Sequence, residues 1–166
     1  IIFNYSHKII CSFISRAFRD RNRTRIESLI KTYQALFLLY EDTLHGLQEL
    51  AKTHLERFPE LIIVGITGSN GKTTTKEMLG TILSRHTPTA VAAGNLNSEI
   101  GLPLAALKVK QEHKVAVFEM GMNRAGEMDV LTHIVHPDYA VITNIGTAHI
   151  GNLGSRDAIA AEKKKI

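Results

Sequence analysis

LIIVGITGSNGKTTTKEM, residues 61–78, contains the strongest structural signal in the chain. It starts with a short continuous run of apolar residues, which is typical of a strand buried on both faces of a parallel sheet. A helical pattern begins at Lys72 and is expected to continue to about Arg85. The Gly-rich segment TGSNGKTTT lies between the two patterns, so the sequence predicts a strand, a tight loop and a helix in direct succession.

This loop has the chemistry of a phosphate-binding site but not the commonest spacing. The usual pattern places a Gly five residues before the Gly of Gly-Lys-Thr, and here that position is Ile66. Backbone N–H groups at a helix N-terminus nevertheless favour an anion. Lys72 could reach the β- and γ-phosphates, and the hydroxyl of Thr73 could ligate Mg²⁺. A tight turn with a Gly-rich cap is the alternative, but the apolar run directly before Gly-Lys-Thr-Thr favours a nucleotide.

Strand and helix patterns alternate over residues 61–166. This alternation predicts an α/β fold with a mostly parallel sheet flanked by helices, similar to P-loop NTPases. Short strands are expected at 61–67, 89–94, 114–120 and 139–146, and helices at 72–85, 100–109, 125–136 and 155–166. An amphipathic helix is expected before them, at 41–58, with Asp42 or Thr43 at its start and Pro59 at its end.

The predicted organisation is an Arg-rich N-terminal remnant at 1–37, a linker helix at 38–60 and a central ATP-binding domain at 61–166. Apolar residues make up 44% of the 166 residues, which indicates a globular class. The net charge is +4, with five arginines in one short segment: Arg16, Arg19, Arg21, Arg23 and Arg25. The single cysteine, Cys11, excludes an internal disulfide, and no apolar run is long enough to span a membrane. The chain starts at Ile1 rather than Met and stops within a helical pattern, so we interpret it as a fragment.

Two further side chains are candidates at the loop's edge of the sheet. Glu119 ends the third predicted strand of this region, and His149 follows the fourth. Because ligands gather at the carboxyl ends of parallel strands, Glu119 is expected beside the loop as a partner for Mg²⁺. A solvent-facing acid and an ordinary surface histidine are the alternatives. The run Lys163 to Lys165 is by itself typical of a solvated helix end.

Taken together, these segments resemble the ATP-dependent Mur ligases of peptidoglycan synthesis. The family's short loop variant, T-G-x-x-G-K-[ST]-[ST], matches TGSNGKTT at residues 67–74 at every fixed position. The resemblance continues in GNLNSEIGLPLAAL, FEMGMNRAGEM and TNIGTAHIGNLGS, and EDTLHGLQELAKTH is similar to the segment before the central domain. The resemblance covers about residues 38–166, and it is greatest to the family members that add D-alanyl-D-alanine. Residues 1–37 do not resemble the family's N-terminal domain, and this chain is expected to lack the family's C-terminal domain.

The resemblance implies roles for individual residues. Lys72 would hold the γ-phosphate, Thr73 and Glu119 would ligate one Mg²⁺, and His149 a second. Lys163 would be carbamylated, with Lys164 as the neighbouring possibility, although Glu162 stands where the family often has a small residue. The ATP-binding loop would comprise Gly68, Ser69, Asn70, Gly71, Lys72, Thr73 and Thr74, and Asn95 and Asn97 would line the phosphate or substrate site.

The resemblance also implies an activity and partners. ATP and Mg²⁺ would drive amide-bond formation between UDP-N-acetylmuramoyl-tripeptide and D-Ala-D-Ala through an acyl phosphate. A cytoplasmic monomer is expected, with no nucleic-acid partner, no membrane insertion and no ligase activity in the fragment alone. Three alternatives stay open: a ligase of the folylpolyglutamate or cyanophycin type, a P-loop switch or motor ATPase, and a nucleic-acid-binding module that uses the Arg cluster.

Overall fold

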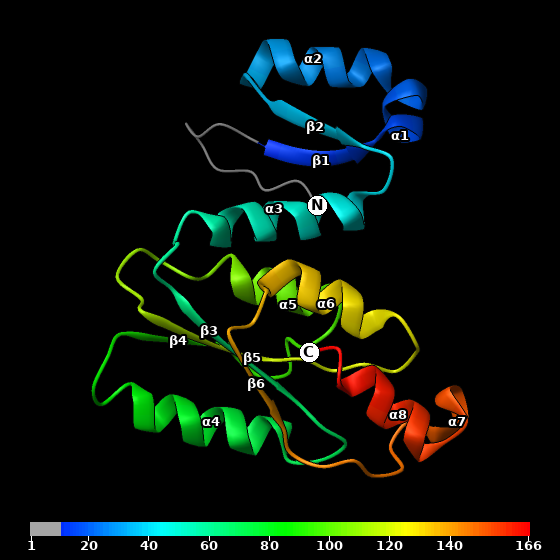
Figure 1. Ribbon diagram of the computed structural model, residues 1–166. Helices are drawn as coiled ribbons and strands as arrows, with labels where there is room; N and C mark the ends of the chain where they lie inside the picture. The colour runs from blue at the N-terminus through cyan, green and yellow to red at the C-terminus, as the bar shows by residue number, and fades with distance from the viewer. Residues whose placement is uncertain (1–10) are drawn as a thin grey trace. The chain divides into compact units, whose positions relative to one another are not determined.

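The computed structural model describes residues 11–166 and divides the chain into two compact units, Ile1–Leu47 and Gln48–Ile166 (Figure 1). The division falls within helix α3 (Thr43–Glu56). Asp42 accepts a hydrogen bond from the backbone N–H of Leu44 at 2.8 Å, so it satisfies one of the free donors at the start of this helix, as the sequence predicted.

The described part of the first unit is a strand–helix–helix–strand arrangement. Its elements are β1 (Cys11–Ser15), α1 (Arg16–Arg21), α2 (Arg23–Tyr33) and β2 (Leu36–Tyr40). The two strands pair in parallel, which requires a crossover connection such as the two helices provide. The helices also carry the arginine cluster, in which Arg16 pairs with Glu41 at 2.7 Å and Arg23 with Glu27 at 3.0 Å. The sequence patterns did not predict the two strands.

The second unit is built on a four-stranded parallel sheet in the order β4-β5-β3-β6 (Figure 1). Its strands are β3 (Ile62–Thr67), β4 (Thr89–Val91), β5 (Val115–Glu119) and β6 (Tyr139–Ile142). Its helices after α3 are α4 (Lys72–Leu83), α5 (Gly101–Ala106), α6 (Glu127–Val135), α7 (Ile150–Leu153) and α8 (Arg156–Lys163).

Apolar side chains of this sheet alternate between two cores. Ala116 and Phe118 of β5 belong to the larger core, which includes residues of α5, α6 and α8. Val115 and Val117 belong to the smaller core on the opposite face, where Leu79 and Leu83 of α4 pack against it. Figure 1 shows α4 on one side of the sheet and α5 and α6 on the other. Helices on both faces explain why the strands are continuously apolar in sequence.

The predicted α/β fold with a parallel sheet flanked by helices is confirmed. Each strand and helix expected after residue 61 is present, with ends displaced by a few residues. The four-residue helix α7 was not predicted, because a single turn carries no periodic apolar pattern. Within residues 11–166, no helix is long and apolar enough to cross a membrane.

Candidate nucleotide-binding site

The phosphate loop, defined here as residues 67–74, connects the end of β3 to the start of α4. Gly71 precedes the helix with φ 78°, and Gly68 has φ 149°, so both occupy the region that side chains rarely adopt. A Cβ on Gly68 would also lie 1.9 Å from the Thr143 hydroxyl oxygen. The loop therefore needs glycine at Gly68 for its backbone conformation and for the close approach of β6.

Lys72 lies at the first position of α4. Its ammonium donates a hydrogen bond to the carbonyl oxygen of Gly68 at 2.9 Å. This bond folds the side chain back over the loop, so that its charge is held beside the backbone N–H groups that open the helix. A positive charge and free N–H donors at one helix N-terminus are the combination that binds phosphate.

Glu119 at the end of β5 is 2% exposed and has a partner on each carboxylate oxygen. The hydroxyl of Thr73 donates to one oxygen at 2.7 Å, and the side-chain amide of Asn97 donates to the other at 2.7 Å. The structure thus brings together Thr73 and Glu119, which the resemblance had assigned to one metal ion. Gly121 keeps space for this contact, because a Cβ there would lie 3.0 Å from the amide carbon of Asn97.

Asn97 reaches Glu119 from the loop that follows β4, and a buried lysine holds the start of that loop. Lys76 is fully buried in α4 and donates to the carbonyl oxygen of Gly94 at 2.7 Å, with Glu77 at 3.1 Å. Asn95, the other predicted residue of this loop, is exposed.

The segment after β6 lies directly against the phosphate loop. Asn144 accepts from the backbone N–H of Asn70 and donates to its carbonyl oxygen, and the Thr143 hydroxyl donates to the same oxygen. The hydroxyl of Ser69, which is buried, accepts from the backbone N–H of Gly146 at 2.9 Å. Within the described residues, the Ser69 hydroxyl is therefore hydrogen-bonded to the segment after β6.

His149 follows in the same loop and is exposed, with a left-handed backbone (φ 66°) just before α7. The structure does not gather it with other ligands. Residues 11–166 contain no group of three or more histidine, cysteine, aspartate or glutamate side chains that could hold a metal ion.

Lys163 is 1% exposed near the end of α8, whereas Lys164 is exposed. Burial, together with the nearby charge of Lys72, lowers the pKa of Lys163 from 10.5 to about 8. The fold thus places Lys163 close enough to the phosphate loop to experience the charge of Lys72. The sequence, taken alone, indicated a solvated helix end for this lysine.

Glu162, the departure from the family pattern, is also buried. One of its carboxylate oxygens accepts from the backbone N–H groups of Gly126 and Met128, at 2.9 and 3.1 Å, at the start of α6. The other oxygen pairs with Lys165 at 2.8 Å. Glu162 therefore joins α8 to α6, a role that no local sequence signal reveals.

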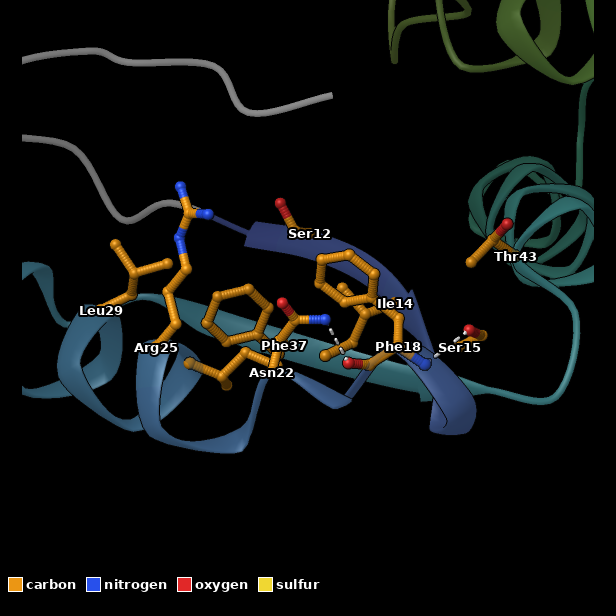
Figure 2. Close-up of a pocket in the computed structure, with 10 residues that line it drawn as sticks. Ser12, Ile14, Ser15, Phe18, Asn22, Arg25, Leu29, Phe37 and Thr43 are labelled. Atoms are coloured by element: carbon orange, nitrogen blue, oxygen red, sulfur yellow. Dashed lines mark hydrogen bonds between the residues drawn. The ribbon is translucent and has the colours of Figure 1, made fainter. Parts of the chain in front are cut away.

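The first unit contains a hollow of about 400 Å³ of its own (Figure 2). Phe18 and Phe37 contribute to its largely apolar lining, and the Asn22 amide donates to the Phe18 carbonyl oxygen at 2.9 Å. None of the lining residues within 11–166 is acidic, so these residues offer no carboxylate for a metal ion.

Sequence reasoning pointed to Lys72, Thr73 and Glu119 from the positions of the loop and of a strand end, and the resemblance added Asn97. It missed Thr143, Asn144 and Lys76. Thr143 and Asn144 could have been found by the rule that pointed to Glu119, since they come directly after the parallel strand β6. The partner of Lys76 lies in another loop, and periodicity cannot predict that contact.

A parallel sheet with this loop between β3 and α4, and a carboxylate beside it, has the architecture of P-loop nucleotide-binding proteins. Comparison with known proteins identifies one family within this class of nucleotide-binding proteins. Residues 66–166 match the model of the Mur ligase middle domain. The chain belongs to the Mur ligase family.

Curated relatives include UDP-N-acetylmuramoyl-tripeptide–D-alanyl-D-alanine ligases of Treponema pallidum and Bacillus subtilis. They are 52% and 47% identical over 81% and 78% of this chain. The chain spans only 29% and 28% of their lengths.

Solved structures of Mur ligases are also similar to this chain. MurF from Acinetobacter baumannii is 45% identical, with a TM-score of 0.77, over 81% of this chain and 30% of its own. MurF ligase from Thermotoga maritima, in complex with ADP, is 38% identical, with a TM-score of 0.73, over 78% of this chain and 30% of its own.

Proposed function

We propose that residues 61–166 form the central ATP-binding domain of a ligase that joins D-Ala-D-Ala to UDP-N-acetylmuramoyl-tripeptide. The relatives with this activity in their names are 52% and 47% identical to the chain. The names of these relatives favour D-Ala-D-Ala as the acceptor over the acceptors of the folylpolyglutamate and cyanophycin enzymes. The ADP complex of the Thermotoga relative supports ATP as the nucleotide.

The observation that carries the proposal is the contact between Thr73 and Glu119 beside the phosphate loop. A hydroxyl and a carboxylate oxygen 2.7 Å apart are hard oxygen donors of the kind that Mg²⁺ prefers. The amide of Asn97 fixes the second carboxylate oxygen and so orients the group. These residues fit a magnesium ion, which would neutralise phosphate charge when it is bound.

The residues of the chain then have defined tasks. The N–H groups of the loop and the ammonium of Lys72 bind the β- and γ-phosphates, and Lys72 leaves the Gly68 carbonyl to do so. The terminal carboxylate of the tripeptide attacks the γ-phosphorus, ADP leaves, and an acyl phosphate forms. The amine of D-Ala-D-Ala attacks the acyl carbon, phosphate leaves, and the nitrogen loses a proton. Positioning and charge stabilisation are the protein's main contributions to such a transfer.

We propose carbamylation for Lys163 rather than Lys164. With a pKa of about 8, roughly one tenth of the Lys163 side chains are neutral at pH 7. The neutral amine can add to CO₂ with loss of a proton and form an anionic carbamate. Burial increases the fraction of neutral amine that can react, and the positive charge of Lys72 favours the anionic product. His149 stays a proposed second metal ligand, and Asn95 a proposed residue of the substrate site.

We place the complete enzyme in the cytoplasm as a monomer. Its nucleotide and UDP-linked substrates are charged molecules that a cytoplasmic enzyme can reach.

Replacing Lys72 by Ala in a full-length ligase that contains this chain tests the proposal. Acyl-phosphate formation, measured by trapping with hydroxylamine, should fall by roughly 10²–10³-fold or more, because the charge on the transferred phosphoryl group loses its partner. Lys110→Ala, at a lysine whose side chain is 70% exposed, is the matched control and should retain full activity. Undiminished trapping in Lys72→Ala would refute the assignment.

A further inference from the structure

The backbone of Asn70 is held by a side chain from a different loop. Its N–H donates to the side-chain oxygen of Asn144 at 3.2 Å, and its carbonyl oxygen accepts from the side-chain nitrogen of Asn144 at 3.0 Å. We call these two bonds the Asn144–Asn70 pair. An asparagine amide has both a donor and an acceptor, as a peptide group does, so it can pair with a backbone residue in the manner of a neighbouring strand.

Three more hydrogen bonds surround this pair. The Thr143 hydroxyl donates to the Asn70 carbonyl oxygen at 2.6 Å. The backbone N–H of Ser69 donates to the Asn144 carbonyl oxygen at 3.1 Å, and the Ser69 hydroxyl accepts from Gly146 at 2.9 Å. The phosphate loop is therefore bonded along Ser69 and Asn70 to the segment 143–146.

Gly68 also allows the phosphate loop to lie close against the segment 143–146. Any side chain there would collide with the Thr143 hydroxyl, which lies 1.9 Å from the Cβ position. The close approach of the two segments thus depends on features of both: a missing side chain in one and two polar side chains in the other.

The segment 143–146 also contacts the helix that carries Lys163. Arg156, at the start of α8, donates to the carbonyl oxygen of Ile145 at 2.8 Å. His149 follows in the same loop. The segment 143–146 therefore connects the phosphate loop with His149 and with the helix that carries Lys163, and both residues are proposed to act together with the loop.

We propose that Asn144, assisted by Thr143, is a positioning residue that keeps the phosphate loop in its nucleotide-binding shape, a role that presupposes the nucleotide binding proposed above. The two residues act through the backbone of Asn70, which immediately precedes the helix-opening residues Gly71 and Lys72. Without the pair, the loop has more conformations, and only a fraction of the molecules is ready to bind phosphate.

The first test is titration of a full-length ligase that contains this chain with a fluorescent ADP analogue in the presence of Mg²⁺. Asn144→Ala should raise the dissociation constant by roughly tenfold, the equivalent of two modest hydrogen bonds. Asn144→Asp, which keeps the acceptor but loses the donor, should also weaken binding. Asn152→Asp is the control for added charge, because Asn152 bonds to Asn123 outside the phosphate loop, and it should bind almost as wild type does.

Thr143 provides a second pair of variants should Asn144→Ala fold poorly. Thr143→Val removes the hydroxyl at almost constant shape and should weaken binding, whereas Thr143→Ser retains the donor and should restore it. In the full-length ligase, Asn144→Ala should raise the KM for ATP and leave the KM for D-Ala-D-Ala unchanged.

These experiments distinguish the positioning role of Asn144 and Thr143 from the nucleotide-binding role proposed for the domain. If wild type binds the analogue and both Asn144→Ala and Thr143→Val bind equally well, the positioning role is wrong and the proposed function stands. If wild type does not bind the analogue, the nucleotide-binding role fails and the positioning role fails with it.

Discussion

Lys163 shows how the fold changes the chemistry of a single residue. The sequence presents it as one of three consecutive lysines, yet the structure buries it and leaves Lys164 exposed. An ammonium group in that position has lost most of its water and experiences the charge of Lys72. The charge of Lys72, which disfavours the ammonium, would favour an anionic carbamate at the same position.

Lys163 should make stability depend on pH in a predictable direction. Because its pKa is about 8 in the folded chain and 10.5 when unperturbed, the unfolded chain binds more protons between these values. Stability should therefore rise as the pH increases from 8 to 10.5. Relative to Lys163→Met, the free energy of unfolding of wild type should increase by about 3 kcal/mol between pH 7 and 10.5.

Urea unfolding in CO₂-free buffer, followed by circular dichroism, measures this difference. The absence of CO₂ keeps the amine free of carbamate. A difference between wild type and Lys163→Met that stays constant over this pH range would show that Lys163 is not held in a desolvated site.

At the scale of elements, the docking of α8 on α6 depends on polar groups as well as apolar ones. Glu162 satisfies two N–H groups at the start of α6, and Lys165 pairs with Asp129 of α6 at 2.6 Å. The hydrogen bonds that the Lys165 ammonium donates to the carboxylates of Asp129 and Glu162 raise the pKa of Lys165. A negative charge is favourable at a helix N-terminus, so the position of Glu162 also suits the dipole of α6.

Glu162→Ala should destabilise the second unit by about 2–3 kcal/mol, because it leaves the N–H donors of Gly126 and Met128 without their acceptor. Glu162→Gln should cost less, since it retains an acceptor. The urea midpoint reports both changes. Glu112→Ala, at an exposed glutamate with a 3.7 Å ion pair, is the control and should shift stability by less than about 0.5 kcal/mol. Equal midpoints for Glu162→Ala and wild type would contradict this role.

Most elements of the second unit could be predicted from sequence, for a physical reason. Strands covered on both faces are continuously apolar, and the helices that cover them have a clear period, so their alternation is visible without coordinates. Glu119 followed from its position at a strand end. The contacts of Lys76, Asn144 and Glu162 join separate segments of the chain through one or two side-chain hydrogen bonds, which leave no local pattern. The strands of the first unit were missed because β1 and β2 are short and lie among arginine-rich helices.

At the scale of the whole molecule, the second unit provides the loop proposed to bind the nucleotide and the oxygen atoms proposed as metal ligands beside it. A ligase must also hold a carboxylate and an amine, and the chain spans about 30% of the relatives it matches. The proposed activity therefore belongs to a complete protein that contains this chain. A switch or motor ATPase with the same loop would differ in one measurable respect, since it would hydrolyse ATP without an amine acceptor.

The most direct test is the stoichiometry of ATP consumption by that complete protein with UDP-N-acetylmuramoyl-tripeptide, with and without D-Ala-D-Ala. The proposed function predicts one ADP and one phosphate for each amide bond formed, with little turnover when D-Ala-D-Ala is omitted. ATP hydrolysis at the same rate with and without D-Ala-D-Ala, and no amide product, would contradict it.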